Sequence, residues 1–241
     1  MIGADGLSAV QVTYRAWLRQ TARDAGLTTA AVDTMVQHGQ IGHWRRGDLV
    51  ASGAAGAGTV HFVVSGAVQI VCLVPGGASV AAEIVPPGRW FGGSWLDDRA
   101  GGCRFVARAH VPAVVARTGP ELWRTIVMAL PPENVVRLLA YSQARVRRLL
   151  LDRCLLLALP LRERLYHVLG TLAADFGRLE PRGTRIDLPL THADLAALVV
   201  ATRANVTRGL ASLEHDGRII RDDARAVVVC GPHGDQAAGA A

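Results

Sequence analysis

Short apolar runs separated by turn residues fill the first half of the chain, from about Arg45 to Arg117. The runs include VHFVVSG, AVQIVCLVPGG, SVAAEIVPPG and VPAVVART, which are rich in β-branched residues and are cut by glycine or proline. Runs of this length and composition predict strands packed as a sandwich or roll. Residues 7–38 precede them with two helix-like stretches that break near Gly26, the second beginning after a cap-like Thr28.

A single long helix is expected next, between Pro132 and Pro160, because prolines suit a first helical turn and no other helix breaker intervenes. Positions spaced alternately by four and three along it are mostly apolar, which is the pattern of a coiled coil. This seam comprises Val135, Leu139, Ser142, Val146, Leu149, Arg153 and Leu156. A helix packed within its own chain is the alternative, but the length and regular spacing favour a dimer helix.

The last third begins with an amphipathic helix that ends at Gly177 and a polar loop up to Leu190. Thr191 and Asp194 then form a capping signature before a short helix with an apolar face. After a brief turn, Thr202 caps a second helix, whose inner face is Val206, Leu210 and Leu213. The opposite side presents Arg203, Ala204, Arg208, Ala211 and Ser212.

Two short helices of this kind, the second carrying arginine and small residues, suit the major groove of DNA. The following segment, residues 217–229, reads as two strands around a turn at Asp222-Asp223-Ala224, which predicts a wing. An ordinary helical hairpin would leave Arg203 and Arg208 as solvated charges. The combination of caps, turn and wing favours a DNA-binding helix-turn-helix.

The distribution of charge along the chain does not by itself support the DNA-binding assignment. All 26 basic residues are arginine and the net charge is +6, but residues 159–241 carry 10 arginines against 10 acids, so the DNA assignment depends on pattern. The chain starts without a secretory pattern, and glycines and prolines interrupt its apolar stretch at 49–82, so no membrane association is expected. Cys72, Cys103, Cys154 and Cys230 show neither CxxC spacing nor a disulfide framework, which favours a cytoplasmic protein with reduced thiols.

The chain resembles the Crp/Fnr family of bacterial regulators over about residues 27–230. VHFVVSGAVQIV is similar to that family's first roll strands, PPGRWFGG to its later glycine-rich turn, and LPLRERL to the start of its DNA-binding domain. The resemblance implies an α+β fold with N-terminal helices and a cyclic-nucleotide-binding-like β-roll at 1–130. A dimerisation helix and hinge would follow at 131–159, and a winged helix-turn-helix with a short disordered tail at 160–241.

The same resemblance implies a transcription regulator that binds double-stranded DNA as a homodimer. Its two recognition helices would enter a near-palindromic operator about one DNA turn apart, and RNA polymerase is a further candidate partner. Arg203 and Arg208 match the family's base-contacting positions, where arginine fits guanine. The complete candidate DNA set is Thr191, His192, Thr202, Arg203, Ala204, Asn205, Thr207, Arg208 and Arg225, of which Thr191, Thr202 and Arg225 match phosphate contacts.

Two departures from the family pattern bear on the interface. Many members have glutamate between the two arginines, where it accepts from cytosine; here the residue is Ala204, so the commonest half-site is not expected. The turn residue, often glycine, is Val200, which predicts a strained left-handed conformation.

The effector positions depart further. Nucleotide-binding members supply Gly-Glu for the ribose, Arg-Ser for the phosphate and Thr-Ser for the base. The matching positions here are Gly92-Gly93, followed by Ser94, then Cys103-Arg104 and Leu149-Leu150. Cyclic AMP is therefore not expected to bind. Two alternatives stay open: an unknown small-molecule effector, such as an anion held by Arg89, Arg99 or Arg104, and a pocket collapsed onto apolar side chains.

No cofactor or metal is expected. Cys103 has no resolving partner nearby, so an inert thiol is favoured over a redox sensor. An iron–sulfur cluster would need several cysteines in a cluster, and haem bound through His43, His61 or His110 is a minor alternative. A cupin-like metal enzyme also uses a β-roll, but the chain has no HxH motif, so a non-enzyme is expected. A dimeric sensor that no longer binds DNA is the remaining alternative.

Overall fold

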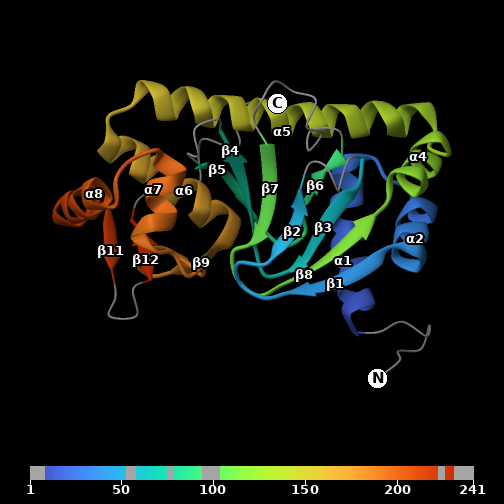
Figure 1. The fold of residues 1–241 in the computed structure, drawn as a ribbon, viewed down its shortest axis with the longest axis horizontal. Coiled ribbons are helices and arrows are strands. Elements are labelled where there is room, and N and C mark those ends of the chain that lie inside the picture. Colours follow the sequence, from blue (N-terminus) through green and yellow to red (C-terminus); the bar gives the residue numbers. More distant parts are fainter. Residues whose placement is uncertain (1–8, 53–57, 75–78, 94–103, 222–225, 231–241) are drawn as a thin grey trace. The chain divides into compact units, whose positions relative to one another are not determined.

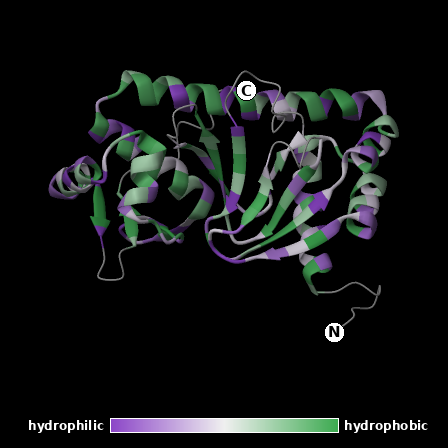
Figure 2. Ribbon diagram, viewed as in Figure 1, coloured by the Kyte–Doolittle hydropathy of each residue, from purple (hydrophilic) through white to green (hydrophobic). Residues whose placement is uncertain are grey.

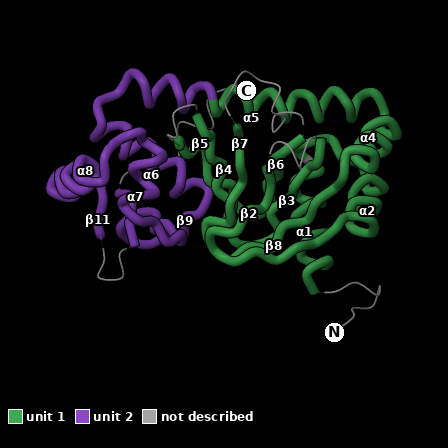
Figure 3. The backbone as a smooth tube through the Cα atoms, in the orientation of Figure 1, with its two compact units in different colours: residues 1–149 green, residues 150–241 purple. Residues whose placement is uncertain are grey.

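A computed structural model describes residues 9–52, 58–74, 79–93, 104–221 and 226–230. The chain divides into two compact units, residues 1–149 and residues 150–241 (Figure 3).

The first unit opens with two helices, α1 (Ala9–Ala25) and α2 (Thr29–His38), as the sequence predicts. Gly26 has a φ of 73°, a left-handed conformation that glycine adopts without strain, and it separates the two helices. The Thr28 side chain accepts a hydrogen bond from the backbone N–H of Ala31 and so caps α2.

Eight strands form the predicted roll as two four-stranded antiparallel sheets (Figure 1). One sheet has the order β1-β8-β3-β6 and the other β2-β7-β4-β5. Their bounds are β1 Gln40–Trp44, β2 Leu49–Ser52, β3 Val60–Ser65, β4 Val68–Leu73, β5 Ser79–Val85, β6 Trp90–Gly92, β7 Arg104–Ala109 and β8 Ala113–Thr118.

The alternation of side chains along β3 explains why both faces of its sheet are apolar. Phe62 and Val64 pack against α1 and α2 on one face, whereas Val63 packs with Ile70 and Val115 in the roll interior. Each face therefore contributes to a separate apolar cluster.

Two helices complete the first unit and lead to the second. The apolar pattern does not predict α4 (Pro120–Met128). The long helix is α5 (Pro132–Ala158), close to its predicted limits, and apolar residues recur along its length (Figure 2).

The second unit has the predicted helices α6 (Leu161–Phe176), α7 (His192–Val199) and α8 (Arg203–His215). The prediction of a polar loop after Gly177 is wrong in one respect, because this segment contains a hairpin of β9 (Gly177–Glu180) and β10 (Gly183–Ile186). The wing strands are β11 (Ile219–Arg221) and β12 (Val227–Val229). β12 pairs with β10, so the hairpin and the wing form one sheet, β11-β12-β10-β9.

Candidate nucleic-acid interface

Reciprocal hydrogen bonds fix the start of α7. The Thr191 hydroxyl oxygen accepts from the backbone N–H of Asp194 at 3.1 Å, and the Asp194 carboxylate accepts from the backbone N–H of Thr191 at 2.8 Å. The Thr191 hydroxyl also donates to that carboxylate at 2.7 Å. This is the capping box that the sequence predicts. Because the single hydroxyl proton is used here, Thr191 can donate to a phosphate only after its side chain rotates.

The turn between the two helices contains the left-handed residue that the sequence predicts. Val200 has φ 53° and ψ 61°, and it is the one residue other than glycine with positive φ in the described part of the chain. A β-branched residue is strained in this conformation. The turn is nevertheless closed by a hydrogen bond from the Ala201 N–H to the Ala196 carbonyl at 3.0 Å.

One face of α8 is anchored and the other is exposed. Thr202 accepts from the backbone N–H of Asn205 and caps the helix. Val206, Leu210 and Leu213 are buried, as their spacing predicts. The exposed residues of the helix are Arg203, Ala204, Thr207, Arg208, Ala211 and, at its C-terminal end, His215, whereas Ser212 is half-buried. A buried apolar face and an exposed face of arginine and small residues give the helix the shape that a major groove admits.

Hydrogen bonds orient several polar side chains on this surface. His192 of α7 contacts the Thr207 hydroxyl of α8 through Nδ1 at 2.8 Å. The Thr207 hydroxyl donates its proton to the Arg203 carbonyl at 3.0 Å, so His192 Nδ1 must be the donor in their contact. The Arg208 guanidinium donates to Asn205 Oδ1 on the preceding turn. Asn205 therefore restricts the arginine that the sequence predicts to read DNA.

Charged pairs that sequence analysis did not find hold the C-terminal end of α8. Arg221 of β11 donates through Nε to the Glu214 carboxylate at 2.9 Å, which joins the helix to the wing. Arg218 donates to both oxygens of Glu163 on α6, at 2.8 and 2.9 Å, and lies 3.6 Å from the centre of the Tyr166 ring. The pKa of Glu214 is lowered mainly by its hydrogen bonds from Arg221, and that of Glu163 mainly by those from Arg218. These pairs stabilise the orientation of the recognition helix.

The second unit thus brings together eight of the nine candidate DNA residues on α7, α8 and their caps. They are Thr191, His192, Thr202, Arg203, Ala204, Asn205, Thr207 and Arg208. Arg225 and the expected wing turn lie outside the described residues. Within the described part of this unit, no acidic side chain forms an ion pair with Arg203 or Arg208, so both positive charges are available to a ligand.

The candidate effector positions are largely apolar or lie outside the described residues. Gly92 and Gly93 have φ values of 99° and 77° and end strand β6. Leu149 is half-buried and Leu150 is exposed on α5, and Arg104 is exposed at the start of β7. Ser94, Arg99 and Cys103 lie outside the described residues, and Arg89 is exposed.

Arg145 of α5 forms polar contacts with the roll beside these positions. Its guanidinium donates to the carboxylate of Glu83 on β5 and to the backbone carbonyl of Trp90 on β6. The Trp90 ring meets Tyr141 and Trp123 edge-on, with centroid distances of 5.0 and 6.3 Å. The sequence does not predict this cluster, because neither the ion pair nor the aromatic contacts follow a local spacing.

The histidines considered for haem occupy different environments. His61 is buried, and its ring stacks on Phe91 with a centroid distance of 5.0 Å. Burial, helped by the nearby positive charge of Arg117, lowers the pKa of His61 to about 4. His43 is exposed on β1, and His110 is buried. The described residues contain no group of three or more histidine, cysteine or acidic side chains that could hold a metal ion.

Helix α8 has one buried face, α7 precedes it as a capped helix, and β11 and β12 form a two-stranded wing. This arrangement is a winged helix-turn-helix, the DNA-binding domain of a transcription regulator. The family model of the Crp-like helix-turn-helix domain matches residues 163–234. This match lies in the last third of the chain, where the sequence resemblance to the Crp/Fnr regulators is most specific, and it supports that resemblance.

Relatives and solved structures agree with this assignment. The chain is 26% identical to the global nitrogen regulator of Synechococcus elongatus over 80% of this chain and 86% of that protein. The same regulator from Synechocystis is 28% identical, over 72% and 76% respectively. These proteins are regulators, so the cupin-like enzyme alternative is rejected.

The fold is similar to that of a CRP-family transcriptional regulator from Thermus thermophilus, with 24% identity, a TM-score of 0.61 and coverage of 79% of this chain and 92% of that one. It is also similar to the c-di-GMP responsive global regulator CLP of Xanthomonas campestris, with 21% identity, a TM-score of 0.65 and coverage of 85% and 100%. In the described part of the chain, no helix is long and apolar enough to span a membrane.

Proposed function

We propose that this protein is a homodimeric, sequence-specific regulator that reads a near-palindromic operator with α8 and is not controlled by cyclic AMP. The observation that carries the proposal is the exposed face of α8, where Arg203 and Arg208 have no acidic partner among the described residues of their unit. In this proposal its partner is double-stranded DNA and its location is the cytoplasm.

The side chains of this face have different roles in the proposal. Arg208 and Arg203 bind the O6 and N7 acceptors of guanine. Asn205 holds the Arg208 guanidinium in place, which reduces the conformational freedom lost on binding. Thr202, Thr207, His192, Thr191 and Arg225 belong to the phosphate-facing part and set the register. Ala204 offers no acceptor to cytosine, so the half-site differs from that of relatives with glutamate there.

The homodimer is supported by apolar side chains that α5 leaves exposed. Val136, Leu139, Val146, Leu150 and Leu157 are exposed by 64%, 58%, 56%, 61% and 88%. Together with positions 143 and 153 they have alternating spacings of three and four, which is the heptad pattern of a coiled coil. An exposed apolar stripe of this length is typical of an association surface.

This stripe differs from the seam that the sequence predicts at four of seven positions. Val135 packs against the core of the first unit, and Leu156 is only 7% exposed, so these two side chains are already used within the chain. We therefore propose the register 136, 139, 143, 146, 150, 153 and 157 for the dimer. Leu139, Val146 and Arg153 are common to both registers.

The proposal that cyclic AMP is not the effector is supported by the contacts around Gly92 and Gly93. Gly93 has no carboxylate for a ribose hydroxyl, and Leu149 and Leu150 offer no hydrogen bonds to a base. Arg145 is bonded to Glu83 and Trp90, so its guanidinium is satisfied by the chain itself. A different small molecule, or none, acts on the roll.

Selection of bound sequences from a random duplex library by the full-length protein tests the function. The expected product is a near-palindrome whose half-sites are about 10 base pairs apart, centre to centre, with guanine at a fixed position in each. Calorimetry should detect no tight binding of cyclic AMP. A library without enrichment would support the alternative of a dimeric sensor that does not bind DNA, and micromolar nucleotide binding would overturn the effector part.

A further inference from the structure

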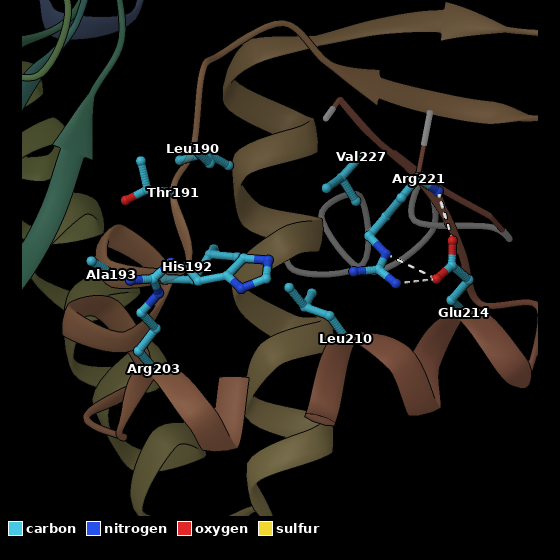
Figure 4. Close-up of a pocket in the computed structure, with 10 residues that line it drawn as sticks. Leu190, Thr191, His192, Ala193, Arg203, Leu210, Glu214, Arg221 and Val227 are labelled. Carbon is cyan, nitrogen blue, oxygen red and sulfur yellow. Dashed lines mark hydrogen bonds and ion pairs between the residues drawn. The ribbon is translucent and has the colours of Figure 1, made fainter. Parts of the chain in front are cut away.

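The second unit contains a cavity of about 790 Å³ between the start of α7, the recognition helix and the wing (Figure 4). Its apolar lining comes from Leu190, Leu195, Leu210 and Val227. Leu195, Leu210 and Val227 are core residues of this unit, so the cavity reaches from the surface to the core. A volume of this size falls in the range that binds small organic molecules.

Three charged side chains and one histidine line the same cavity. Arg221 is neutralised by its contacts with Glu214, on the opposite side of the cavity from Arg203 (Figure 4). Arg203 has no acidic partner among the described residues of this unit. His192 donates through Nδ1 to Thr207, as shown above. The net electrostatic character of the lining is therefore one positive charge beside an apolar floor.

This combination matches a small anion with an apolar body. A flat aromatic ring would cover the half-buried Leu190 and the exposed Ala193, which line the cavity beside Arg203, and remove their apolar surface from water. A carboxylate on that ring would receive charge-assisted hydrogen bonds from the Arg203 guanidinium, which forms them in a planar fork. A neutral polar molecule would leave the apolar lining exposed to water, and a cation would be repelled by the positive charge of Arg203.

We propose that this cavity binds apolar monocarboxylates, with the carboxylate on Arg203, and that its occupancy lowers operator affinity. The regulatory part rests on the proposed function, because it assumes that Arg203 contacts DNA. One guanidinium cannot satisfy a carboxylate and a guanine edge at the same time, so the two ligands compete. By reciprocity, operator DNA lowers the affinity for the carboxylate by the same factor.

Methyl NMR on the full-length protein, labelled at leucine and valine, tests the binding site with naphthoate as the probe. Saturable shifts are expected for the methyl groups of Leu190, Leu195, Leu210 and Val227, and not for the exposed leucines of α5. The neutral isostere naphthamide should bind at least about tenfold more weakly, because it lacks the charge-assisted bond.

Two matched variants locate the carboxylate. Arg203→Gln should weaken naphthoate binding at least about tenfold and remove the preference for naphthoate over naphthamide. Arg208→Gln removes an arginine from the same helix but not from the cavity lining, so naphthoate affinity should be unchanged. Unshifted methyl spectra of both free variants verify the fold. Absence of saturable cavity shifts, or equal losses in the two variants, would overturn the binding site.

Fluorescence anisotropy with the selected operator tests the regulatory part. Naphthoate should raise the apparent operator Kd of the wild-type protein and leave that of Arg203→Gln unchanged. Cavity shifts without any change in operator Kd would overturn regulation and leave the binding site standing. Naphthoate binding by a protein that enriches no DNA would instead refute the proposed function alone.

Discussion

The recognition helix and the Gly92–Gly93 end of the roll are the two candidate ligand sites that the sequence resemblance implies, but their polar groups are arranged differently. On α8, Arg203 and Arg208 lie on the exposed face above a buried apolar one. At Gly92–Gly93 the nearby arginine, Arg145, is bonded to Glu83 and to the Trp90 carbonyl. The first region presents its donors outward, and the second satisfies them within the chain.

The difference between the two regions shows that a backbone fold can be present without the side chains that bind a given ligand. Both regions keep their backbone: α7 and α8 have their caps, and the two sheets of the roll have their expected antiparallel pairing. Ligand chemistry depends instead on a few side chains: Arg203 and Arg208 of α8 match the positions that the resemblance implies, whereas Ala204 and the residues around Gly93 depart from them. The proposed reading function therefore depends on these two arginines, and an effector cannot be carried over from the fold.

The comparison assumes that two copies of α8 act together, so the largest expected effect is loss of the dimer. Val146→Glu places a carboxylate at a seam position common to both registers, where it would be buried without a partner. The dimer dissociation constant should rise at least about 100-fold, equivalent to roughly 3 kcal/mol, and operator affinity should fall with it. Sedimentation at micromolar concentration measures the change.

Ala144→Glu is the matched control, because residue 144 is exposed on α5 but lies off the stripe. It should leave the dimer intact. A Val146→Glu protein that sediments as a stable dimer would contradict the assignment of α5 as the interface.

Adding a hydrogen-bond acceptor to the exposed face of α8 tests whether that face contacts DNA bases. Ala204→Glu places a carboxylate on the exposed face beside Arg203, where it can accept from cytosine N4. The variant should gain a cytosine preference of about 1–3 kcal/mol at one position of each half-site. Competition binding with single-substituted operators measures it, and Ala211→Glu, exposed farther along the same helix, should create no such preference at that position. Uniform weakening by both variants would argue against a groove-facing residue 204.

The apolar and capping patterns predict most of the fold, because they are local. Thr28, Thr191 and Thr202 cap helices as their positions indicate, and Val200 has the left-handed turn conformation. The β9–β10 hairpin was not predictable in this way. It contributes one fully buried apolar residue, Ile186, and it is held by backbone pairing to β12, which comes more than 40 positions later.

The candidate interface was predictable as a set of residues but not as a network. The pairs Glu163–Arg218 and Glu83–Arg145 join residues 55 and 62 positions apart, so no spacing rule finds them. The α5 register shows the same limit. The 4-3 pattern fits two neighbouring stripes, and only tertiary packing of Val135 shows that one of them is partly used within the chain.

The buried imidazole of His61, on strand β3 of the roll, predicts an acid sensitivity. His61 has its folded pKa lowered from 6.5 to about 4, so the unfolded state binds the proton first as the pH falls. Its contribution to stability is complete above pH 6.5 and is lost between pH 6.5 and 4. At pH 5 the loss should reach about 2 kcal/mol.

Thermal unfolding at pH 7.5 and 5.0 measures this loss as a shift in Tm. His61→Gln should flatten the pH dependence, whereas His43→Gln, at an exposed position of β1, should retain it. An unchanged pH dependence in His61→Gln would show that another group causes the acid sensitivity.

The smallest expected effect concerns how the outward-facing arginine is held. Asn205→Ala removes the acceptor for Arg208 and should reduce guanine preference by about 1 kcal/mol. A double-mutant cycle separates positioning from direct contact. If Asn205 acts only through Arg208, then Asn205→Ala should have no further effect on base preference in an Arg208→Ala background. An additive loss would indicate that Asn205 contacts the DNA itself.

The central claim is that α8 reads base sequence and the wing positions the duplex. Binding curves for wild type, Arg208→Ala and Arg225→Ala on single-substituted operators at two salt concentrations test it most directly. Arg208→Ala should lose about 1–3 kcal/mol and flatten the preference at one base pair of each half-site. Arg225→Ala should weaken all sequences alike and reduce the salt slope by about one per site. Uniform weakening by Arg208→Ala together with an altered base preference in Arg225→Ala would reverse the two roles, and no effect of either would contradict docking of α8 in the major groove.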